Sequence, residues 1–569
     1  MRLDKLTIGS PLSYATHHFK NLKDVTIDFD QDHWVTVLIG WNGTGKSNVL
    51  EALAIIFRDL IQYEKKPAFA YKLSYCMGIG HTRKISIDAD PERGNNAFII
   101  HVALNAGETH ESTSSLASQN DQGAPSGKAI TRSAFLADAA NLPRYVFSYY
   151  SGESTRMRDV FQSYLEQYDR KLRGGEDPGA KRLFYAMPVH SQFVLLAFLI
   201  QQDEAVRDVL EKHLGLDANE GLESVLFVLR QPPWKSRDGD PRFWNARGVV
   251  AEFLGRLYEV ALAPIGVERT VATSAWSKKK LGFKYLYVKD IAALRRLVGK
   301  QSPAAFFRDL ESTHVSELID EVRIRVRLKK NDDTVTFREL SEGEQQFLTV
   351  LGLLRFTAEQ ESLFLLDEPD THLNPRWSVD YLSYLRRCVG TSAQVESNSH
   401  IVLTTHNPMA VAELAKEQVQ ILRMQPESDT RHVVACHPEM DPRGLGYAAI
   451  VASDMFGIAS SLDAPTQLLL EQQRAFGSKE KLTHKEQMEL DAINAKLDRL
   501  GFRFFHPDDE YSRYLRLRND ALTTHFQVSD PGSVAARAVS MGRDEREELA
   551  ARLIRQVLEK EGLRRGSAR

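Results

Sequence analysis

One stretch of eight residues constrains this chain more than any other, because it fits a single local geometry. Residues 40–47 read Gly-Trp-Asn-Gly-Thr-Gly-Lys-Ser, with an apolar run at 34–39 before them and an amphipathic run at 48–63 after them. This order predicts a strand, a phosphate-binding loop and a helix. Glycine-rich backbone can wrap a phosphate with its N–H groups at the positive end of the helix. A glycine-rich turn that binds nothing is the alternative, and the strand and helix context argues against it.

The side chains of this loop have separate expected roles. Lys46 can reach the β- and γ-phosphates of a nucleotide, and the hydroxyl of Ser47 can bind Mg²⁺. The sequence therefore predicts ATP and Mg²⁺ as cofactors. The residues expected to bind the nucleotide here are Gly40, Asn42, Gly43, Thr44, Gly45, Lys46, Ser47 and Asn48.

Composition excludes some classes of protein. With 73 basic and 76 acidic residues, the formal charge is −3, so any contact with nucleic acid has to use a local patch. Cys76, Cys388 and Cys436 lack metal-ligand spacing, which argues against a zinc site or a disulfide framework and fits a reducing compartment. Because no apolar run resembles a signal peptide or a membrane span, the expected location is the cytoplasm.

A second catalytic pattern lies far downstream of the loop. The apolar run 363–366 ends in Asp367-Glu368-Pro369, as a buried strand followed by two carboxylates. In this position Asp367 can help to hold Mg²⁺, and Glu368 can act as the base that orients water. Another buried-type strand, 401–405, ends at His406. A histidine packed in the core is the alternative for His406.

Residues 340–345 read Leu-Ser-Glu-Gly-Glu-Gln, which resembles the signature motif of ABC-type ATPases. In that superfamily the signature serine and a helix N-terminus bind the γ-phosphate held by the opposite subunit. The resemblance implies a homodimer that sandwiches ATP, with Asp367 and Glu368 as its Walker B pair and His406 as its switch histidine. Asn374 occupies the position of the D-loop aspartate. The further nucleotide-binding residues that this resemblance implies are Ser341, Gly343, Glu344 and Asn374.

The spacing of the motifs narrows the resemblance. About 290 residues separate Ser47 from Ser341, a longer interval than transporter ATPases have. The chain therefore looks like the RecF, SMC and OLD branch, to which Phe19-Lys20-Asn21-Leu22 is also similar. The segment 145–152 lacks the glutamine that ABC proteins use to sense Mg²⁺. The expected fold class is α/β, an ABC-type ATPase head with a mixed sheet, a helical insertion and a C-terminal helical region.

Changes in pattern along the chain predict four parts. Residues 1–150 form the N-terminal lobe of the head, in which the polar stretch 106–133 is a mobile loop. A mainly helical insertion covers 151–304, the second lobe of the head covers 305–460, and a helical partner-docking region covers 461–569. The other strands are expected at 2–8, 22–30, 34–39, 83–89, 97–104, 144–150, 419–423 and 432–436.

Two further patterns concern possible partners. Strict alternation over 321–330 places Arg323, Arg325 and Arg327 on one strand face, which is either a solvated face or a contact for phosphates. Thr483 with Glu486 forms a capping box that starts the second helix of a C-terminal hairpin. The residues expected to close this hairpin are Ile493, Leu497 and Leu500.

The region after the head carries no Toprim, HNH or PD-(D/E)xK pattern, so we expect no intrinsic nuclease. The segments 149–152, 340–346 and 455–500 are similar to the PtuA family of Septu and retron-associated anti-phage systems. The resemblance implies an ATPase subunit of a defence complex that controls a separate effector nuclease of HNH type. The alternatives are a RecF- or SMC-like DNA-repair ATPase and a slow ATPase that serves as a scaffold holding an effector inactive.

Overall fold

The computed structural model divides the chain into two compact units, Met1–Gly457 and Ile458–Arg569, which we describe separately. The residues that the structure describes are 1–9, 18–78, 80–104, 127–152, 154–179, 181–217, 221–272, 278–329, 334–357, 361–389, 399–425, 432–458, 462–477, 483–500, 514, 517, 521 and 548–555.

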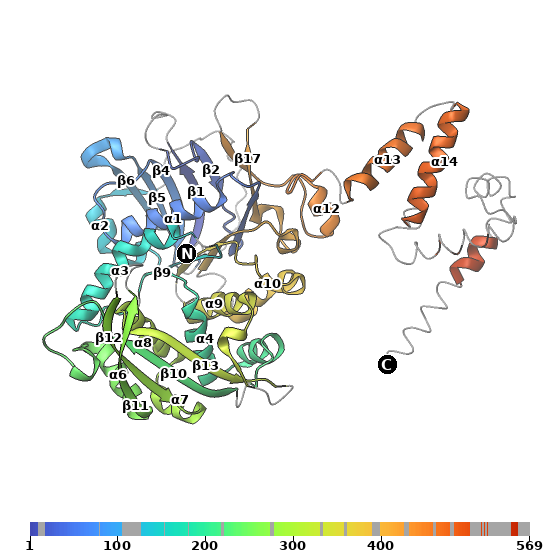
Figure 1. The fold of residues 1–569 in the computed structure, drawn as a ribbon. Helices are drawn as coiled ribbons and strands as arrows, with labels where there is room; N and C mark the ends of the chain where they lie inside the picture. The colour runs from blue at the N-terminus through green and yellow to red at the C-terminus, as the bar shows by residue number, and fades with distance from the viewer. Residues whose placement is uncertain are drawn as a thin grey trace, which may run out of the picture. The chain divides into compact units, whose positions relative to one another are not determined.

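A seven-stranded sheet forms the centre of the first unit (Figure 1). Leu38 packs in one hydrophobic cluster, while its neighbours Val37 and Ile39 pack in another. Because successive side chains of a strand point to opposite faces, this sheet is buried on both sides. Its strands, in spatial order and parallel except for the edge strand β18, are β18 (Val433–Cys436), β17 (Val419–Met424), β3 (Val35–Gly40), β16 (Ser399–Thr404), β15 (Ser362–Asp367), β8 (Tyr145–Tyr150) and β9 (Leu183–Tyr185).

A second, antiparallel sheet of six strands covers the phosphate-loop helix α1 (Lys46–Ile61). Leu53 of α1 shares one buried cluster with Leu365 of the central sheet and Leu6 of the second sheet. The helix therefore packs between the two sheets, which fixes the direction in which the loop opens. The strands in spatial order are β2 (Val25–Asp28), β1 (Arg2–Ile8), β4 (Tyr71–Met77), β5 (Arg83–Ala89), β6 (Phe98–Leu104) and β7 (Lys128–Ile130).

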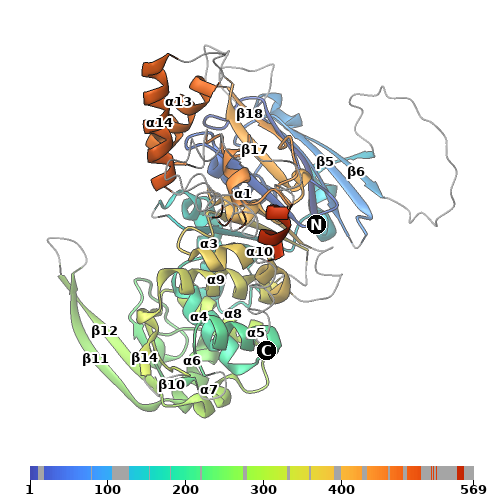
Figure 2. The same cartoon turned by 90° about the vertical axis from the view of Figure 1, so that its right-hand side faces the viewer.

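A third sheet, of five antiparallel strands, lies in the insertion together with several helices. The hairpin of its first two strands extends away from the rest of the sheet (Figure 2). The strands in spatial order are β11 (Leu262–Ala272), β12 (Lys278–Val288), β10 (Leu222–Arg230), β13 (Ile319–Arg327) and β14 (Thr334–Thr336).

Helices surround these sheets, and none among the described residues is long and apolar enough to cross a membrane. The other α-helices among the described residues of the first unit are α2 (Arg132–Ala137), α3 (Arg156–Gly174), α4 (Val189–Ile200), α5 (Glu204–Asp208), α6 (Gly248–Val260), α7 (Ile291–Val298), α8 (Pro303–Val315), α9 (Glu342–Thr357), α10 (Pro375–Val389) and α12 (Tyr447–Ala452).

The structure corrects three expectations about this unit. The insertion at 151–304 is not mainly helical, because β10, β11 and β12 lie within it. The second lobe does not begin at 305, since β13 and β14 complete the insertion sheet. The loop predicted at 106–133 lies outside the described residues up to 126, but β7 and the start of α2 occupy its last part. In addition, β4 was not predicted, and β3 pairs in the central sheet, away from β1 and β2.

The arginine row of β13 is largely paired with acidic side chains. Arg323 lies 2.8 Å from Glu321, and Nε of Arg325 lies 3.6 Å from Oε2 of Glu223. Both arginines are about half exposed. These pairs favour the interpretation of a solvated sheet face over a free cationic track.

The second unit contains a helical hairpin of α13 (Ala464–Gly477) and α14 (His484–Arg499). The predicted capping box is confirmed: Glu486 N–H donates to Thr483 Oγ1, and Thr483 N–H donates to Glu486 Oε2 at 2.8 Å. Ile493 and Leu497 are buried as expected, whereas Leu500 is 60% exposed and does not close the hairpin. Leu500 lies just beyond the helix, because α14 ends one residue earlier, at Arg499.

Candidate nucleotide-binding site

The loop between β3 and α1 has the backbone of a phosphate cradle. Gly40, Gly43 and Gly45 have φ angles of 146°, 83° and 98°, which side chains rarely tolerate. A Cβ on Gly40 would lie 2.4 Å from the carbonyl oxygen of Leu422, and one on Gly45 would lie 2.8 Å from Oδ1 of Asn21. Glycine is therefore required at Gly40 by conformation and by space, and at Gly45 by its positive φ angle.

The ammonium group of Lys46 is turned into this loop. Its Nζ donates hydrogen bonds to the carbonyl oxygens of Gly40, at 2.8 Å, and Trp41, at 3.3 Å. Burial lowers the pKa of Lys46, while the nearby carboxylates of Glu368 and Asp367 oppose that shift. A nucleotide phosphate would offer this cation a stronger, charged acceptor than two carbonyls.

Two asparagines stabilise the loop through side-chain hydrogen bonds. Asn21 Nδ2 donates to the carbonyl oxygen of Gly43 at 3.0 Å, and Asn48 Nδ2 donates to Asn21 Oδ1 at 2.7 Å. Asn48 was predicted to bind nucleotide, but in this structure its amide supports the loop through Asn21. The role of Asn21 could not be derived from local pattern, because 22 residues separate it from Gly43.

Asp367 ends β15 directly beside Ser47. Its Oδ1 accepts hydrogen bonds from Ser47 Oγ at 2.9 Å and Thr404 Oγ1 at 2.6 Å. Its Oδ2 is buried and has no hydrogen-bond partner. Burial raises the pKa of Asp367, and the hydrogen bonds from Thr404 and Ser47 oppose this shift. A buried carboxylate oxygen beside a serine hydroxyl fits Mg²⁺, which prefers oxygen ligands.

The protein supplies only part of such a metal site. Within the described ranges, no group of three or more His, Cys, Asp or Glu side chains could hold a metal ion. Mg²⁺ commonly binds through one or two protein oxygens together with phosphates and water. Ser47 and Asp367 are therefore suited to hold Mg²⁺ jointly with a nucleotide, for which the ion would neutralise phosphate charge.

Glu368 and His406 meet at the ends of adjacent strands. Oε1 of Glu368 lies 3.2 Å from Nε2 of His406, and both side chains are partly exposed. This hydrogen bond is the main reason that the pKa of Glu368 lies below its usual range. Glu368 has φ 52°, and its N–H donates to both oxygens of Thr404. An ionised, partly exposed carboxylate held in this way can accept a proton from water.

The residues predicted to form a signature motif make their hydrogen bonds locally. Ser341 N–H and Oγ–H donate to Glu344 Oε2, and Glu344 N–H donates to Ser341 Oγ, which forms a capping box at the start of α9. A Cβ on Gly343 would lie 2.4 Å from the carbonyl oxygen of His372, so the helix start packs against the segment after β15. Asn374 caps α10 by accepting the N–H of Trp377 at 3.0 Å. Among the described residues, none of these four predicted residues is hydrogen-bonded to the phosphate loop.

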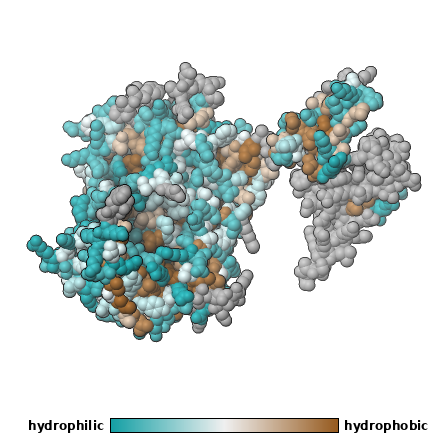
Figure 3. Space-filling model, in the orientation of Figure 1, coloured by the Kyte–Doolittle hydropathy of each residue, from teal (hydrophilic) through white to brown (hydrophobic). Residues whose placement is uncertain are grey.

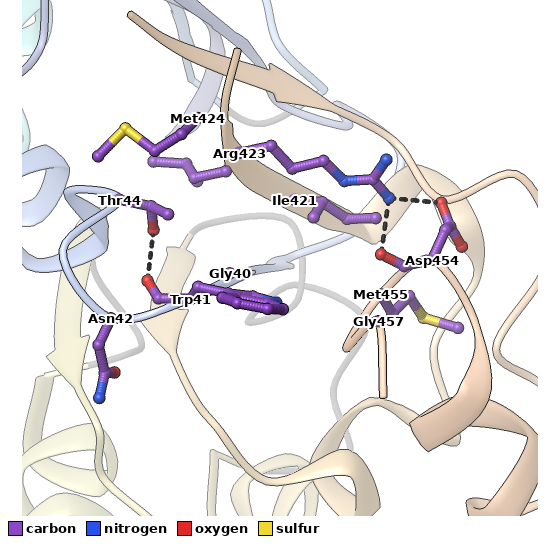
Figure 4. A pocket seen from close by; sticks show the side chains of 11 residues that line it. Gly40, Trp41, Asn42, Thr44, Ile421, Arg423, Met424, Asp454, Met455 and Gly457 are labelled. Carbon is purple, nitrogen blue, oxygen red and sulfur yellow. Dashed lines mark hydrogen bonds and ion pairs between the residues drawn. The ribbon is translucent and has the colours of Figure 1, made fainter. Parts of the chain in front are cut away.

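A pocket of about 430 Å³ adjoins the loop (Figure 4). Trp41, whose side chain is 70% exposed, lies at the pocket, and its Nε1–H donates to the carbonyl oxygen of Phe456 at 3.3 Å. Thr44 Oγ1 donates to the carbonyl oxygen of Trp41, and Arg423 pairs with Asp454 at 3.0 Å. The other lining residues are Gly40, Asn42, Ile421, Leu422, Met424, Met455 and Gly457.

The fold and the site together define a class. Lys46, Ser47, Asp367, Glu368 and His406 come from three separated segments and meet where β3, β15 and β16 end. This is a phosphate-loop α/β domain of the nucleotide-binding ATPase class.

Comparisons with known proteins place the chain within that class. A family described as "AAA domain, putative AbiEii toxin, Type IV TA system" matches residues 241–412. A second, described as "AAA ATPase domain", matches residues 17–123. The second match covers the phosphate loop, and the first covers Asp367, Glu368 and His406.

Two curated proteins are similar over shorter stretches. The Septu protein PtuA of Bacillus mycoides (strain KBAB4) is 22% identical over 163 residues, which are 27% of this chain and 22% of that protein. The Retron Vc95 probable ATPase of Vibrio cholerae serotype O1 biovar El Tor is 22% identical over 199 residues, or 33% of this chain and 35% of that protein. The matches thus span less than half the length of either relative. They relate this chain, at low identity, to the ATPases of Septu and retron defence systems.

Proposed function

We propose that this chain binds and hydrolyses ATP with Mg²⁺ as an ABC-type head. The observation that carries the proposal is the meeting of Ser47, Asp367, Glu368 and His406 beside Lys46. Lys46 and the loop N–H groups bind the phosphates, Ser47 and Asp367 hold the metal ion, and Glu368 accepts the proton of the attacking water. His406 orients Glu368 through its hydrogen bond and lies where it can contact the γ-phosphate.

The experiment that tests this activity is phosphate release by the purified chain. We expect release from ATP that requires Mg²⁺ and stops when EDTA removes it, because the metal neutralises charge developing on the phosphates. The rate is measured at increasing protein purity. Release that is insensitive to EDTA, or none at any Mg²⁺ concentration, contradicts the proposal.

We further propose that two copies enclose two nucleotides. The exposed Ser341 stands at the N-terminus of α9, where the helix dipole favours an anion. Its hydrogen bonds run to Glu344 and not to the phosphate loop. The γ-phosphate on a second copy is an anion that suits this helix end, as the signature motif of ABC-type ATPases implies.

The related proteins suggest the biological setting, since they are named for Septu and retron systems. We propose that the chain serves in anti-phage defence and acts on a separate effector, which the resemblance suggests is an HNH nuclease. The docking surface is the hairpin of α13 and α14. Leu468 and Met488 are 55% and 64% exposed on it, and Figure 3 shows brown, apolar side chains on these helices. Exposed apolar side chains that gather on one element favour a protein partner.

Deletion of residues 458–569 tests the docking surface. We expect the remaining chain to bind ATP normally, because the site lies wholly in the unit Met1–Gly457, but to lose co-purification with its effector. In the intact chain, Leu468→Ser with Met488→Ser should weaken co-purification, while Lys485→Ser, a change at an exposed site on α14, should not. An effector that still co-purifies with the truncated chain, or loss of ATP binding, rejects this surface.

The two other functions predict different results. A DNA-repair ATPase should bind DNA in a salt-sensitive manner, but the pairing of Arg323 and Arg325 with glutamates does not favour such contact. A scaffold that holds an effector inactive should bind ATP with little turnover. Hydrolysis and co-purification measured on the same sample therefore separate the three.

A further inference from the structure

An arginine that the motifs do not include lies at the metal end of the site. Arg156 is the first residue of α3, six residues after β8 ends. Its guanidinium lies 3.5 Å from Oδ2 of Asp367, 3.9 Å from Oε2 of Glu51 and 3.5 Å from Oδ1 of Asn48. It also lies over the ring of Tyr150, with 5.4 Å to the centroid. Contacts with β15, α1 and β8 thus hold one side chain at one place.

Of these neighbours, Asp367 depends most on Arg156. Glu51 already has a closer cation, since Lys20 Nζ lies 2.5 Å from its Oε2. The ammonium of Lys46 is hydrogen-bonded to the loop carbonyls. The Oδ2 atom of Asp367 is buried without a hydrogen-bond donor, and Arg156 is the cation that faces it. A buried carboxylate without a nearby positive charge is costly.

The same carboxylate is, with Ser47, the group that we propose to hold Mg²⁺. A divalent cation bound between Ser47 and Asp367 would come close to the guanidinium, and like charges at such a distance repel. Arg156 and Mg²⁺ therefore cannot both neutralise Asp367 in the geometry observed. One of them has to yield when the other binds.

We propose that Arg156 takes the place of the divalent cation beside Asp367 in the nucleotide-free head, and that Mg²⁺ arriving with ATP displaces it. This inference rests on the proposed nucleotide site. Arg156 is a positioning residue, because it acts through the carboxylate of Asp367. The contact between Arg156 and Asp367 makes Mg²⁺ affinity depend on the first turn of α3. This helix packs against α1, which follows the phosphate loop, and against α6, which lies in the insertion.

The test compares Arg156→Gln with Arg158→Gln in the full-length chain. Arg158 lies two residues further along α3 and is exposed. Its replacement by glutamine also removes one positive charge, but at a position outside the site. Thermal unfolding is followed while MgCl₂ is titrated, with and without the non-hydrolysable analogue AMP-PNP. We expect Arg156→Gln to unfold at a lower temperature without Mg²⁺, and to reach half of its Mg²⁺-dependent stabilisation at a roughly 2- to 10-fold lower concentration than the wild type. Arg158→Gln should match the wild type.

An unchanged or raised Mg²⁺ midpoint in Arg156→Gln overturns the proposal, because a competing cation cannot be removed without favouring its competitor. If Arg156→Gln does not fold, Arg156→Lys is the second variant. It keeps the positive charge but has a shorter side chain without the guanidinium group, so its Mg²⁺ midpoint should lie below that of the wild type. A midpoint at or above the wild-type value then overturns the proposal. If the wild type itself shows neither Mg²⁺ nor AMP-PNP stabilisation, the nucleotide site fails as well. If the wild type is stabilised and only Arg156→Gln fails to shift, the site stands and this inference falls.

Discussion

Glu368→Gln is expected to lower the rate of ATP hydrolysis by roughly 10²- to 10⁴-fold, the usual contribution of a positioned general base. The amide has the same shape and can keep the hydrogen bond with His406, which lies 3.2 Å from the carboxylate. It cannot accept the proton of the attacking water. Phosphate contacts made by Lys46 remain, so ATP should bind with near-normal affinity. The bound ATP should then hold two copies together as a dimer.

Two measurements check this variant. Phosphate release gives the rate, and sedimentation with and without ATP reports whether a dimer accumulates. Glu413→Gln, at an exposed position in the segment after β16, is the matched control and should behave as the wild type. Hydrolysis by Glu368→Gln at the wild-type rate would show that another group activates water.

Lys46→Ala is expected to weaken ATP binding on the order of 10- to 100-fold, since hydrogen bonds to charged groups each contribute about 1.5–3 kcal/mol. The effect on hydrolysis should be larger, because Lys46 also stabilises charge that develops on the leaving phosphate. Fluorescent-nucleotide titration measures the affinity, and circular dichroism verifies that the variant folds.

The control for Lys46→Ala is Lys300→Ala, which removes an exposed lysine from the insertion. It should leave nucleotide affinity unchanged. If Lys46→Ala binds ATP as tightly as this control, the nucleotide does not occupy the phosphate loop, and the proposed site is wrong.

Much of the site could be predicted because its residues are held by local backbone. Lys46 and Ser47 belong to the first turn of the helix that follows the loop, and Glu368 follows a short apolar strand. In both cases a few neighbouring residues determine the conformation. The same holds for the capping box of Thr483 and Glu486, where both partners lie within one helical turn.

The insertion could not be predicted because its sheet depends on distant pairing. β10 pairs with β13, about 100 residues further along the chain, and the register is set only when they meet. The outer strand β11 has nearly every residue exposed and contains Pro264 and Gly266, two residue types that are depleted in strands.

The contacts of the side chains that surround the site could not be predicted from the sequence either. Asn21 reaches the loop, Thr404 reaches Asp367, and Arg156 faces the same carboxylate, each from a different part of the chain. Asn, Thr and Arg are common at surfaces, and no spacing rule marks them. Their roles come from the tertiary fold, which brings a loop between β1 and β2, the end of β16 and the start of α3 to the same site.

The central claim is that each active site combines the phosphate loop of one copy with the signature motif of another. Mixing Lys46→Ala with Ser341→Arg tests it directly, since each variant should be inactive alone while each mixed dimer contains one intact site. In an equal mixture of exchanging dimers, hydrolysis should recover to about a quarter of the wild-type rate. Failure to recover activity at any mixing ratio, or full activity of Ser341→Arg alone, would contradict a site shared between two copies.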